Sequence, residues 1–169
     1  MEQYNNYWKL YKEEIPSCGC FYDPKAVIRV RPMNVQEVKY LSTLCSQNAT
    51  DIINEIVKKC TLFEHMEFDD LLLADREYIA FWLRANSFQQ NNGYTLNLKC
   101  EKCGTDYTHT TQLAEFPTVL FDSNKPKHKT VLLPDCKVTL QLKYPTTKEL
   151  TRKSNNIKIQ NFIRHMDLN

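Results

Sequence analysis

The sequence predicts an α+β fold in which a helical middle layer packs against short antiparallel β-hairpins. Apolar residues recur at helical spacing between about residues 34 and 88. Runs that alternate between apolar and polar residues lie on both sides of this region. The chain has 169 residues, of which 42% are hydrophobic, so it is large enough to bury a core of its own. We expect one domain with a small appendage.

The appendage is an N-terminal aromatic arm over residues 1–14, and residues 15–169 form the predicted single α+β domain. Four aromatic rings in the arm recur at spacings of three and four, which predicts an amphipathic helix with one aromatic face. This face packs either on its own domain or on a partner protein, and aromatic anchors are common at interfaces. The four rings are those of Tyr4, Tyr7, Trp8 and Tyr11.

The first part of the domain, from Ile15 to Met33, has the composition of a hairpin. Turn-forming residues come first, and the run 26–31 (AVIRVR) has strand composition. A helix follows, and Asn34 stands three residues before Glu37, as in a capping box. The predicted inward stripe of this helix is Val38, Leu41, Leu44 and Cys45.

Two further helices complete the predicted helical layer, over about residues 51–60 and 69–88. In the second of these, Asp75 and Arg76 interrupt the apolar face. We expect at least one of them to be buried and paired, with Arg31 or Arg84 as partners for the carboxylate.

The second half of the chain reads as two hairpins and a last helix. The runs 94–99 and 107–111 alternate and are joined by a tight turn, which predicts a hairpin over residues 94–112. Two more strands are predicted at 131–133 and 138–144. Thr146 and Glu149 then form a capping-box pattern that opens the C-terminal helix.

The turn of the 94–112 hairpin carries a metal-binding pattern, Cys100-Glu101-Lys102-Cys103-Gly104. A C-x-x-C turn followed by glycine directs two thiolates toward one ion, as in the knuckle of a zinc ribbon. A structural zinc site needs two further ligands, for which Cys18 and Cys20 are the first choice. The predicted cofactor is therefore a structural zinc ion, and the alternative is a tight hairpin with two small buried cysteines.

Other ligands and other cysteine chemistries were weighed. The fallback ligands are His109, His65, Cys60 and Cys136. A catalytic zinc is disfavoured because no H-x-x-E-H or H-x-E…C-x-x-C pattern is present. A thioredoxin-like role is disfavoured because that motif opens a helix, whereas this one joins two strands. The sequence also lacks a nucleophile elbow, a P-loop and a dinucleotide fingerprint.

Nucleic-acid binding is the main alternative function, because zinc ribbons often bind nucleic acid. Basic side chains and two tyrosines that could stack on bases are candidates for such a surface. The net charge of only +2 argues against a dedicated nucleic-acid binder. The candidate residues are Arg29, Arg31, Lys99, Lys102, Lys125, Lys127, His128, Lys129, Tyr94 and Tyr107.

The sequence also bears on the compartment in which the chain works. Its N-terminal residues are polar and lack the apolar stretch of a signal peptide. Seven cysteines, an odd number, favour free or metal-bound thiols in a reducing environment. No run approaches the roughly 18 apolar residues of a membrane span.

The order of several short motifs resembles one family. Ile15-Pro16-Ser17 with Gly19, then Phe21-Tyr22, then the run 30–33 (VRPM) with Glu37, is similar to the opening of small baseplate-hub assembly proteins of T-even-type contractile-tailed phages. The similarity continues through Asp75-Arg76 and Leu83-Arg84, Tyr94, the Cys100-to-Gly104 turn, Leu113 and Tyr144-Pro145-Thr146. It covers roughly residues 15–150, and the chain departs from it at Cys18, where the family more often carries Lys or Arg, and at Cys20.

This resemblance implies a non-enzymatic structural or assembly protein. It implies binding to other hub or tail proteins, in the virion tail baseplate or in the host cytoplasm during assembly. The aromatic arm is the predicted partner-binding segment, and neither a membrane nor a nucleic acid is expected as a partner.

Overall fold

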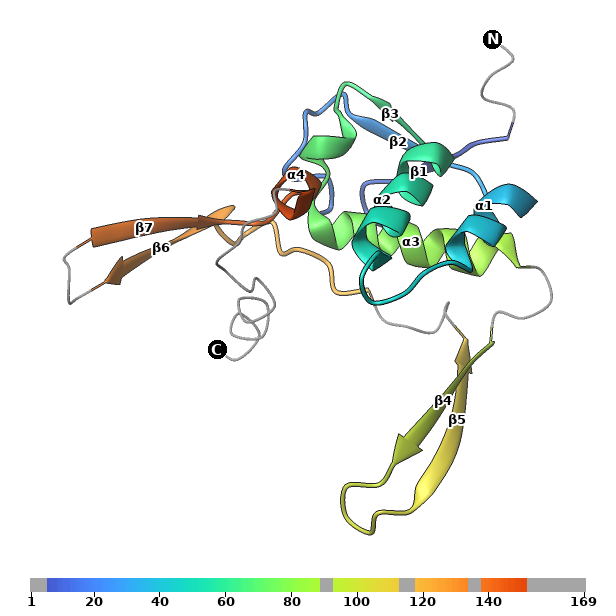
Figure 1. Cartoon of the computed structure of the whole chain (residues 1–169). Helices are drawn as coiled ribbons and strands as arrows, with labels where there is room; N and C mark the ends of the chain where they lie inside the picture. Colours follow the sequence, from blue (N-terminus) through green and yellow to red (C-terminus); the bar gives the residue numbers. More distant parts are fainter. Residues whose placement is uncertain (1–5, 89–92, 113–117, 134–137, 152–169) are drawn as a thin grey trace.

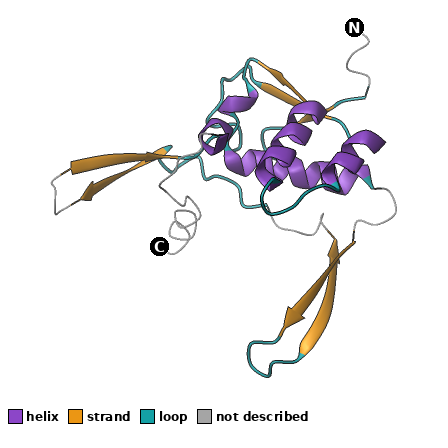
Figure 2. Cartoon of the chain, viewed as in Figure 1, coloured by secondary structure: helices purple, strands orange, loops and turns teal. Residues whose placement is uncertain are grey.

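The computed structural model describes residues 6–88, 93–112, 118–133 and 138–151, and it confirms the α+β class (Figure 1). A body of helices and a small sheet carries two hairpins that project from it in different directions (Figure 2). In chain order the elements are β1 (Trp8–Leu10), β2 (Val27–Val30), α1 (Val35–Leu41), α2 (Ala49–Cys60), β3 (Thr61–Glu64), the 3₁₀ helix η1 (Phe68–Asp70), α3 (Leu73–Ser87), β4 (Gly93–Lys99), β5 (Asp106–Gln112), β6 (His128–Leu133), β7 (Val138–Lys143) and α4 (Thr147–Thr151).

The sheet of the body is antiparallel, with β2 between β1 and β3. Ile28 lies opposite Leu10 on one side and Phe63 on the other. Alternate residues of a strand point to opposite faces, and accordingly Ile28 and Val30 are buried while their neighbours are half-buried. The sheet thus presents one apolar face to the helices.

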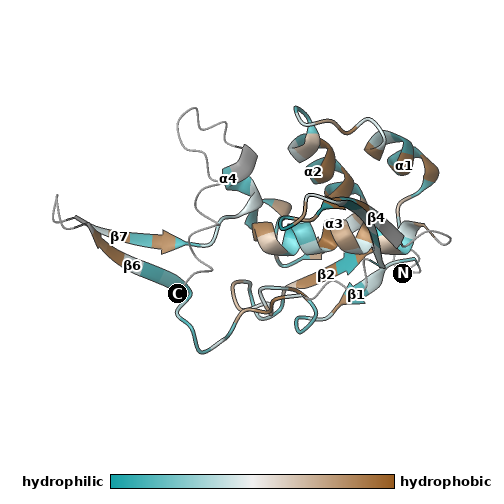
Figure 3. Cartoon of the chain, turned by 90° about the horizontal axis from the view of Figure 1, so that it is seen from below, coloured by the Kyte–Doolittle hydropathy of each residue, from teal (hydrophilic) through white to brown (hydrophobic). Residues whose placement is uncertain are grey.

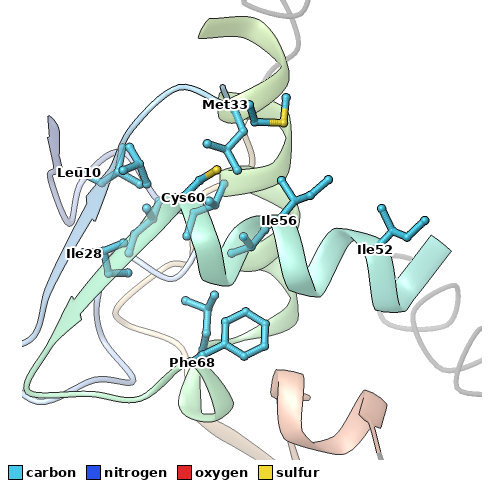
Figure 4. Packing of buried hydrophobic residues seen from close by; sticks show 13 residues of the cluster. Leu10, Ile28, Met33, Ile52, Ile56, Cys60 and Phe68 are labelled. Carbon is cyan, nitrogen blue, oxygen red and sulfur yellow. The ribbon is translucent and has the colours of Figure 1, made fainter. Parts of the chain in front are cut away.

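The core lies between this face and helices α2 and α3 (Figure 4). Figure 3 shows the hydrophobic segments of α2, α3 and β2 gathered in the same part of the molecule. Burying such side chains contributes roughly 1.5–3 kcal/mol each. The buried cluster consists of Leu10, Ile15, Ile28, Val30, Met33, Ile52, Ile56, Val57, Cys60, Phe68, Leu71, Ile79 and Leu83.

The helix starts follow the predicted chemistry. At α1 the Glu37 N–H donates to Asn34 Oδ1 at 3.0 Å, and the Asn34 N–H donates to Glu37 Oε2 at 2.8 Å, which confirms the capping box. At α4 the Thr146 N–H donates to Glu149 Oε2 at 3.0 Å. The remainder of the predicted C-terminal helix lies outside the described residues.

The last described segment is tied to the body on both sides of the β6–β7 hairpin. The Thr147 N–H donates to the Leu71 carbonyl at 2.9 Å. The rings of Phe21, Phe121 and Tyr144 pack edge to face, with centroids 4.9 to 5.7 Å apart. The Phe121 N–H also donates to the Pro16 carbonyl at 2.7 Å. The base of this hairpin is therefore fixed although its strands project.

The two projecting hairpins have no core of their own. No side chain of β4–β5 or β6–β7 whose exposure the structure describes is buried. A two-stranded hairpin is marginally stable by itself in water. Within the described residues, no helix is long and apolar enough to cross a membrane.

Three sequence-based expectations are corrected. Residues 8–10 form strand β1 instead of a helix, because the free edge of β2 pairs with them. The 15–33 hairpin is absent, because β2 pairs with β1 and β3 and not with the preceding turns. Cys45 is exposed, because α1 ends at Leu41 and the helical stripe ends with it.

Candidate functional site

The tip of the β4–β5 hairpin holds the C-x-x-C motif in a closed turn. The Gly104 N–H donates to the Cys100 carbonyl at 2.8 Å, and the Cys100 N–H donates to the Thr105 carbonyl at 2.9 Å. Gly104 has φ +72°, a conformation that glycine adopts without the steric cost of a side chain. The hairpin predicted for residues 94–112 is thus confirmed, with Lys99 and Asp106 as its last pair.

Cys103 is the more exposed thiol of this turn. Its Sγ lies 3.3 Å from the Thr105 hydroxyl oxygen. Hydrogen bonds from the side chain and backbone of Thr105, and from the Cys100 side chain, lower the pKa of Cys103 to about 7. The thiolate is the form of cysteine that binds metals and attacks electrophiles.

The other predicted ligands, Cys18 and Cys20, lie in the body. Cys18 Sγ donates to the Phe121 carbonyl at 3.6 Å, and Cys20 Sγ donates to the Cys18 carbonyl at 3.8 Å. Among the residues that the structure describes, no three His, Cys, Asp or Glu side chains form a group that could hold a metal ion. The fold therefore does not bring the two cysteine pairs together within one chain.

The fallback ligands are also dispersed. Cys60 is buried in the core, where burial and the neighbouring Glu37 carboxylate raise the pKa of its thiol to about 12. His65 is exposed in the turn after β3. His109 is exposed in β5, opposite Leu96. Cys136 lies outside the described residues.

The predicted partner-binding aromatics divide into three groups. Tyr4 lies outside the described residues. Tyr7 is half-buried, and its hydroxyl accepts a hydrogen bond from Arg31 Nε at 3.2 Å. Trp8 and Tyr11 remain 56% and 60% exposed. Trp82 of α3, which the sequence analysis did not single out, lies with its ring centroid 6.2 Å from that of Trp8.

We use the name aromatic edge for the exposed rings of Trp8 and Tyr11, in and just after β1, together with the Trp82 ring that lies beside Trp8. It is not a detachable arm, because Leu10 is one of the core residues. The side chain of Trp82 is half-buried, and its ring is tilted by 51° against that of Trp8. Exposed aromatic rings on a rigid strand suit contact with another protein.

Three of the candidate nucleic-acid residues have contacts within the body. Arg29 Nε contacts Glu64 Oε1 at 2.8 Å, and Arg31 Nη2 contacts Glu37 Oε1 at 2.7 Å. Lys127 donates to the Cys20 carbonyl and lies near the ring of Phe21. The side chain of Tyr94 is not among those whose exposure the structure describes.

Residues of the resemblance motifs form a buried hydrogen-bond network. The Ser17 N–H donates to Asp75 Oδ1 at 2.8 Å, and the Tyr22 hydroxyl donates to Asp75 Oδ2. The Gly19 N–H donates to Ser17 Oγ at 3.0 Å, and the Leu72 N–H donates to Tyr22 Oη at 3.0 Å. The network ties the Pro-Ser turn to the start of α3. Asp75 is fully buried, and both of its carboxylate oxygens accept hydrogen bonds from this turn.

Gly19 occupies a special place in this turn. Its φ is +66°, and a Cβ atom there would lie 2.7 Å from Lys12 Cδ. A side chain at this position would therefore strain the backbone as well as collide with Lys12. The turn that docks on Asp75 requires glycine.

The burial expected for Asp75 and Arg76 is confirmed, while the partners expected for Asp75 are wrong. Arg31 pairs with Glu37 instead. Arg76 Nε donates to Asn54 Oδ1 at 2.6 Å, and its guanidinium also contacts Glu77. Helical periodicity locates such charges on a buried face, but the partners Asn54 and Ser17 lie 22 and 58 residues away along the chain.

One family model matches nearly the whole chain. The model describes the T4 bacteriophage base plate protein and covers residues 11–167. No curated protein matches the sequence, and no solved structure matches the fold. The match includes the Ser17–Asp75 network, the Arg31–Glu37 pair and the cysteine turn. The chain thus belongs to the T4 bacteriophage base plate protein family and has a structural role in a phage tail baseplate.

Proposed function

We propose that this baseplate protein works in the central hub, where it binds neighbouring hub or tail proteins without catalysing a reaction. The observation that carries the proposal is the aromatic edge. Trp8 and Tyr11 are exposed in and just after strand β1, which pairs with β2 and is anchored in the core by Leu10. Such side chains are the usual anchors of protein–protein interfaces.

The outline of the molecule supports the same role. Two hairpins project from the body and bury none of the side chains that the structure describes there (Figure 1). They expose unpaired strand edges to which a neighbouring chain can add a strand. A small subunit of this form can contact several neighbours at once.

The nucleic-acid alternative has weaker support. The net charge is only +2. Arg29, in strand β2, and Arg31, just after it, are each paired with a glutamate. A nucleic-acid binder concentrates unpaired basic side chains on one face. A DNA- or RNA-binding assay over a range of salt concentrations separates the two functions, because a steep salt dependence would favour the alternative.

The direct test is co-purification of tail proteins with tagged wild-type chain and with the double variant Trp8→Ala/Tyr11→Ala. We expect at least a tenfold loss of captured hub protein, since each aromatic anchor contributes about 1–3 kcal/mol. The matched control is Tyr40→Ala, which removes an exposed ring from α1. Equal capture by the double variant and the control, with all proteins folded, would refute the role of the aromatic edge.

A further inference from the structure

We propose that two copies of this chain share one zinc ion at the tips of their β4–β5 hairpins, through Cys100 and Cys103 of each copy. The inference goes beyond the proposed hub function, because it assigns a metal site and a partner of known sequence. Its basis is a pair of cysteines that the described residues of one chain do not complete to a metal site.

The geometry of the tip supplies two ligands. The closed turn from Cys100 to Gly104 holds both cysteines on one loop, with the backbone hydrogen bonds at 2.8 and 2.9 Å. Residues 101–110 are all exposed, and the tip points away from the body (Figure 1). A second molecule can therefore approach the thiols without obstruction from the helices.

A structural zinc site is closed by four ligands in a tetrahedron, most often thiolates and imidazoles. Within the described part of this chain, no third His, Cys, Asp or Glu side chain joins the two thiols. Cys18 and Cys20 are occupied with carbonyl contacts in the body. An identical hairpin supplies two further thiolates in the same geometry, and a two-fold axis through the ion would relate the two copies.

The hairpin also has a face that a second copy can cover. Leu98 lies opposite Tyr107, and Leu96 lies opposite His109, so these four side chains share one face of the two-stranded sheet. Leu98 and Tyr107 are exposed apolar groups beside the tip. The opposite face is polar, with Thr95 facing Thr110 and Asn97 facing Thr108 through side-chain contacts of 3.3 and 3.4 Å.

This amphipathic pattern is typical of a hairpin that packs on something, yet the body does not cover it. Two hairpins that meet through their apolar faces would bury this surface and bring their tips together. Zinc would then fix the contact, because metal binding contributes directly to the stability of the folded arrangement.

The experiment uses the full chain, purified alone and supplied with Zn²⁺. We expect about one zinc ion per two chains by elemental analysis. Light scattering should give the mass of a dimer with zinc and of a monomer after a chelator is added. Titration with Co²⁺ should produce the absorption of a tetrahedral thiolate complex that saturates at about one ion per two chains.

Two double variants separate the candidate ligands. Cys100→Ser/Cys103→Ser should lose both the metal and the dimer, whereas Cys18→Ser/Cys20→Ser should keep both. An unchanged melting curve of the first variant shows that the body remains folded. Three outcomes would overturn the inference: no bound zinc, a dimer that survives the chelator, or one zinc per monomer that depends on Cys18 and Cys20. None of these outcomes depends on hub proteins, so the hub function is tested separately.

Discussion

Two cysteines of this chain, Cys60 and Cys103, show how differently its body and its β4–β5 hairpin are built. Cys60 is part of the core, and burial raises the pKa of its thiol to about 12. Cys103 stands in solvent, and hydrogen bonds around Thr105 lower its pKa to about 7. The same side chain is thus a buried packing group in one region and a solvent-exposed thiol with a lowered pKa in the other.

The difference extends to the neighbours of each region. The body packs thirteen buried apolar side chains into one cluster, and its buried charges are hydrogen-bonded to groups from distant segments. In the described sheets β4 pairs with β5, and the side chains of residues 101–110 are all exposed. We infer that the stability of the isolated chain resides in the body, while the hairpin contributes to assembly.

The largest effect that would test this division is expected at Asp75. Substitution Asp75→Ala leaves the Ser17 N–H and the Tyr22 hydroxyl buried without their acceptor. Each orphaned donor costs about 1–3 kcal/mol, so we expect the free energy of unfolding to fall by about 4 kcal/mol. Urea denaturation of wild type and variant measures the change.

Asp75→Asn is the matched control, because its amide oxygen can still accept the Ser17 N–H and the volume is unchanged. We expect a smaller loss than for alanine. A melting curve of Asp75→Ala that superimposes on wild type would show that the network does not hold the Pro-Ser turn to α3, and the body would then depend on its apolar core alone.

The next effect concerns pH and the Arg31–Glu37 pair. Hydrogen bonding from Arg31 lowers the pKa of Glu37 to about 2, below its ordinary value of 4.5. The pair therefore stabilises the fold fully above pH 4.5 and is lost as the pH falls toward 2. Both side chains are largely buried, at 22% and 9% exposure. We expect Glu37→Gln to lower the free energy of unfolding by about 2 kcal/mol at pH 7. The variant should also lose less stability than wild type when the pH falls from 4.5 toward 2.

Glu64→Gln is the comparison for this experiment. Glu64 pairs with Arg29, but the two side chains are 35% and 29% exposed. An exposed pair contributes under about 1 kcal/mol. The two variants could instead lose the same free energy of unfolding and respond to acid as wild type does. Burial would then not make the Arg31–Glu37 pair stronger than the Arg29–Glu64 pair.

Much of the local structure was predictable because its causes are local. The capping box of Asn34 and Glu37 depends on residues three apart, and it forms as expected. Likewise the β4–β5 hairpin follows from alternation and a tight turn. Strand β3 was missed because Thr61–Glu64 is short and follows α2 directly, without a turn residue to mark its start.

Two local structures were not predictable from spacing alone: strand β1, which depends on a tertiary contact, and the end of α1, where side-chain hydroxyls compete for backbone carbonyls. The spacing of Tyr7, Trp8 and Tyr11 fits a helix, but pairing with β2 imposes a strand. The first helix stops early because hydroxyls compete for its carbonyls: Ser42 Oγ donates to Lys39 O at 2.6 Å, and Thr43 Oγ1 donates to Tyr40 O at 2.7 Å. Cys45 is left outside the helix for this reason.

The candidate site was predictable only in part. The C-x-x-C turn is evident from the sequence, whereas its separation from Cys18 and Cys20 depends on where the fold directs the hairpin. Trp82 carries no signal that distinguishes it from a core residue of α3. Its contact with Trp8 depends on the placement of β1 beside that helix.

The smallest effect on the isolated chain is expected in the hairpin. The double variant Leu98→Ala/Tyr107→Ala removes the apolar pair beside the tip, but both side chains are exposed in the monomer. Surface substitutions of this kind usually change stability by less than about 0.5 kcal/mol. We therefore expect the urea transition of the metal-free monomer to remain unchanged, while the proposed zinc-dependent dimer weakens because its apolar contact is lost. A monomer destabilised as strongly as by Asp75→Ala would show that the hairpin packs on the body in solution. The body and the hairpin would then share one core. The different pKa values of Cys60 and Cys103 would then result only from how deeply each thiol is buried in that one unit.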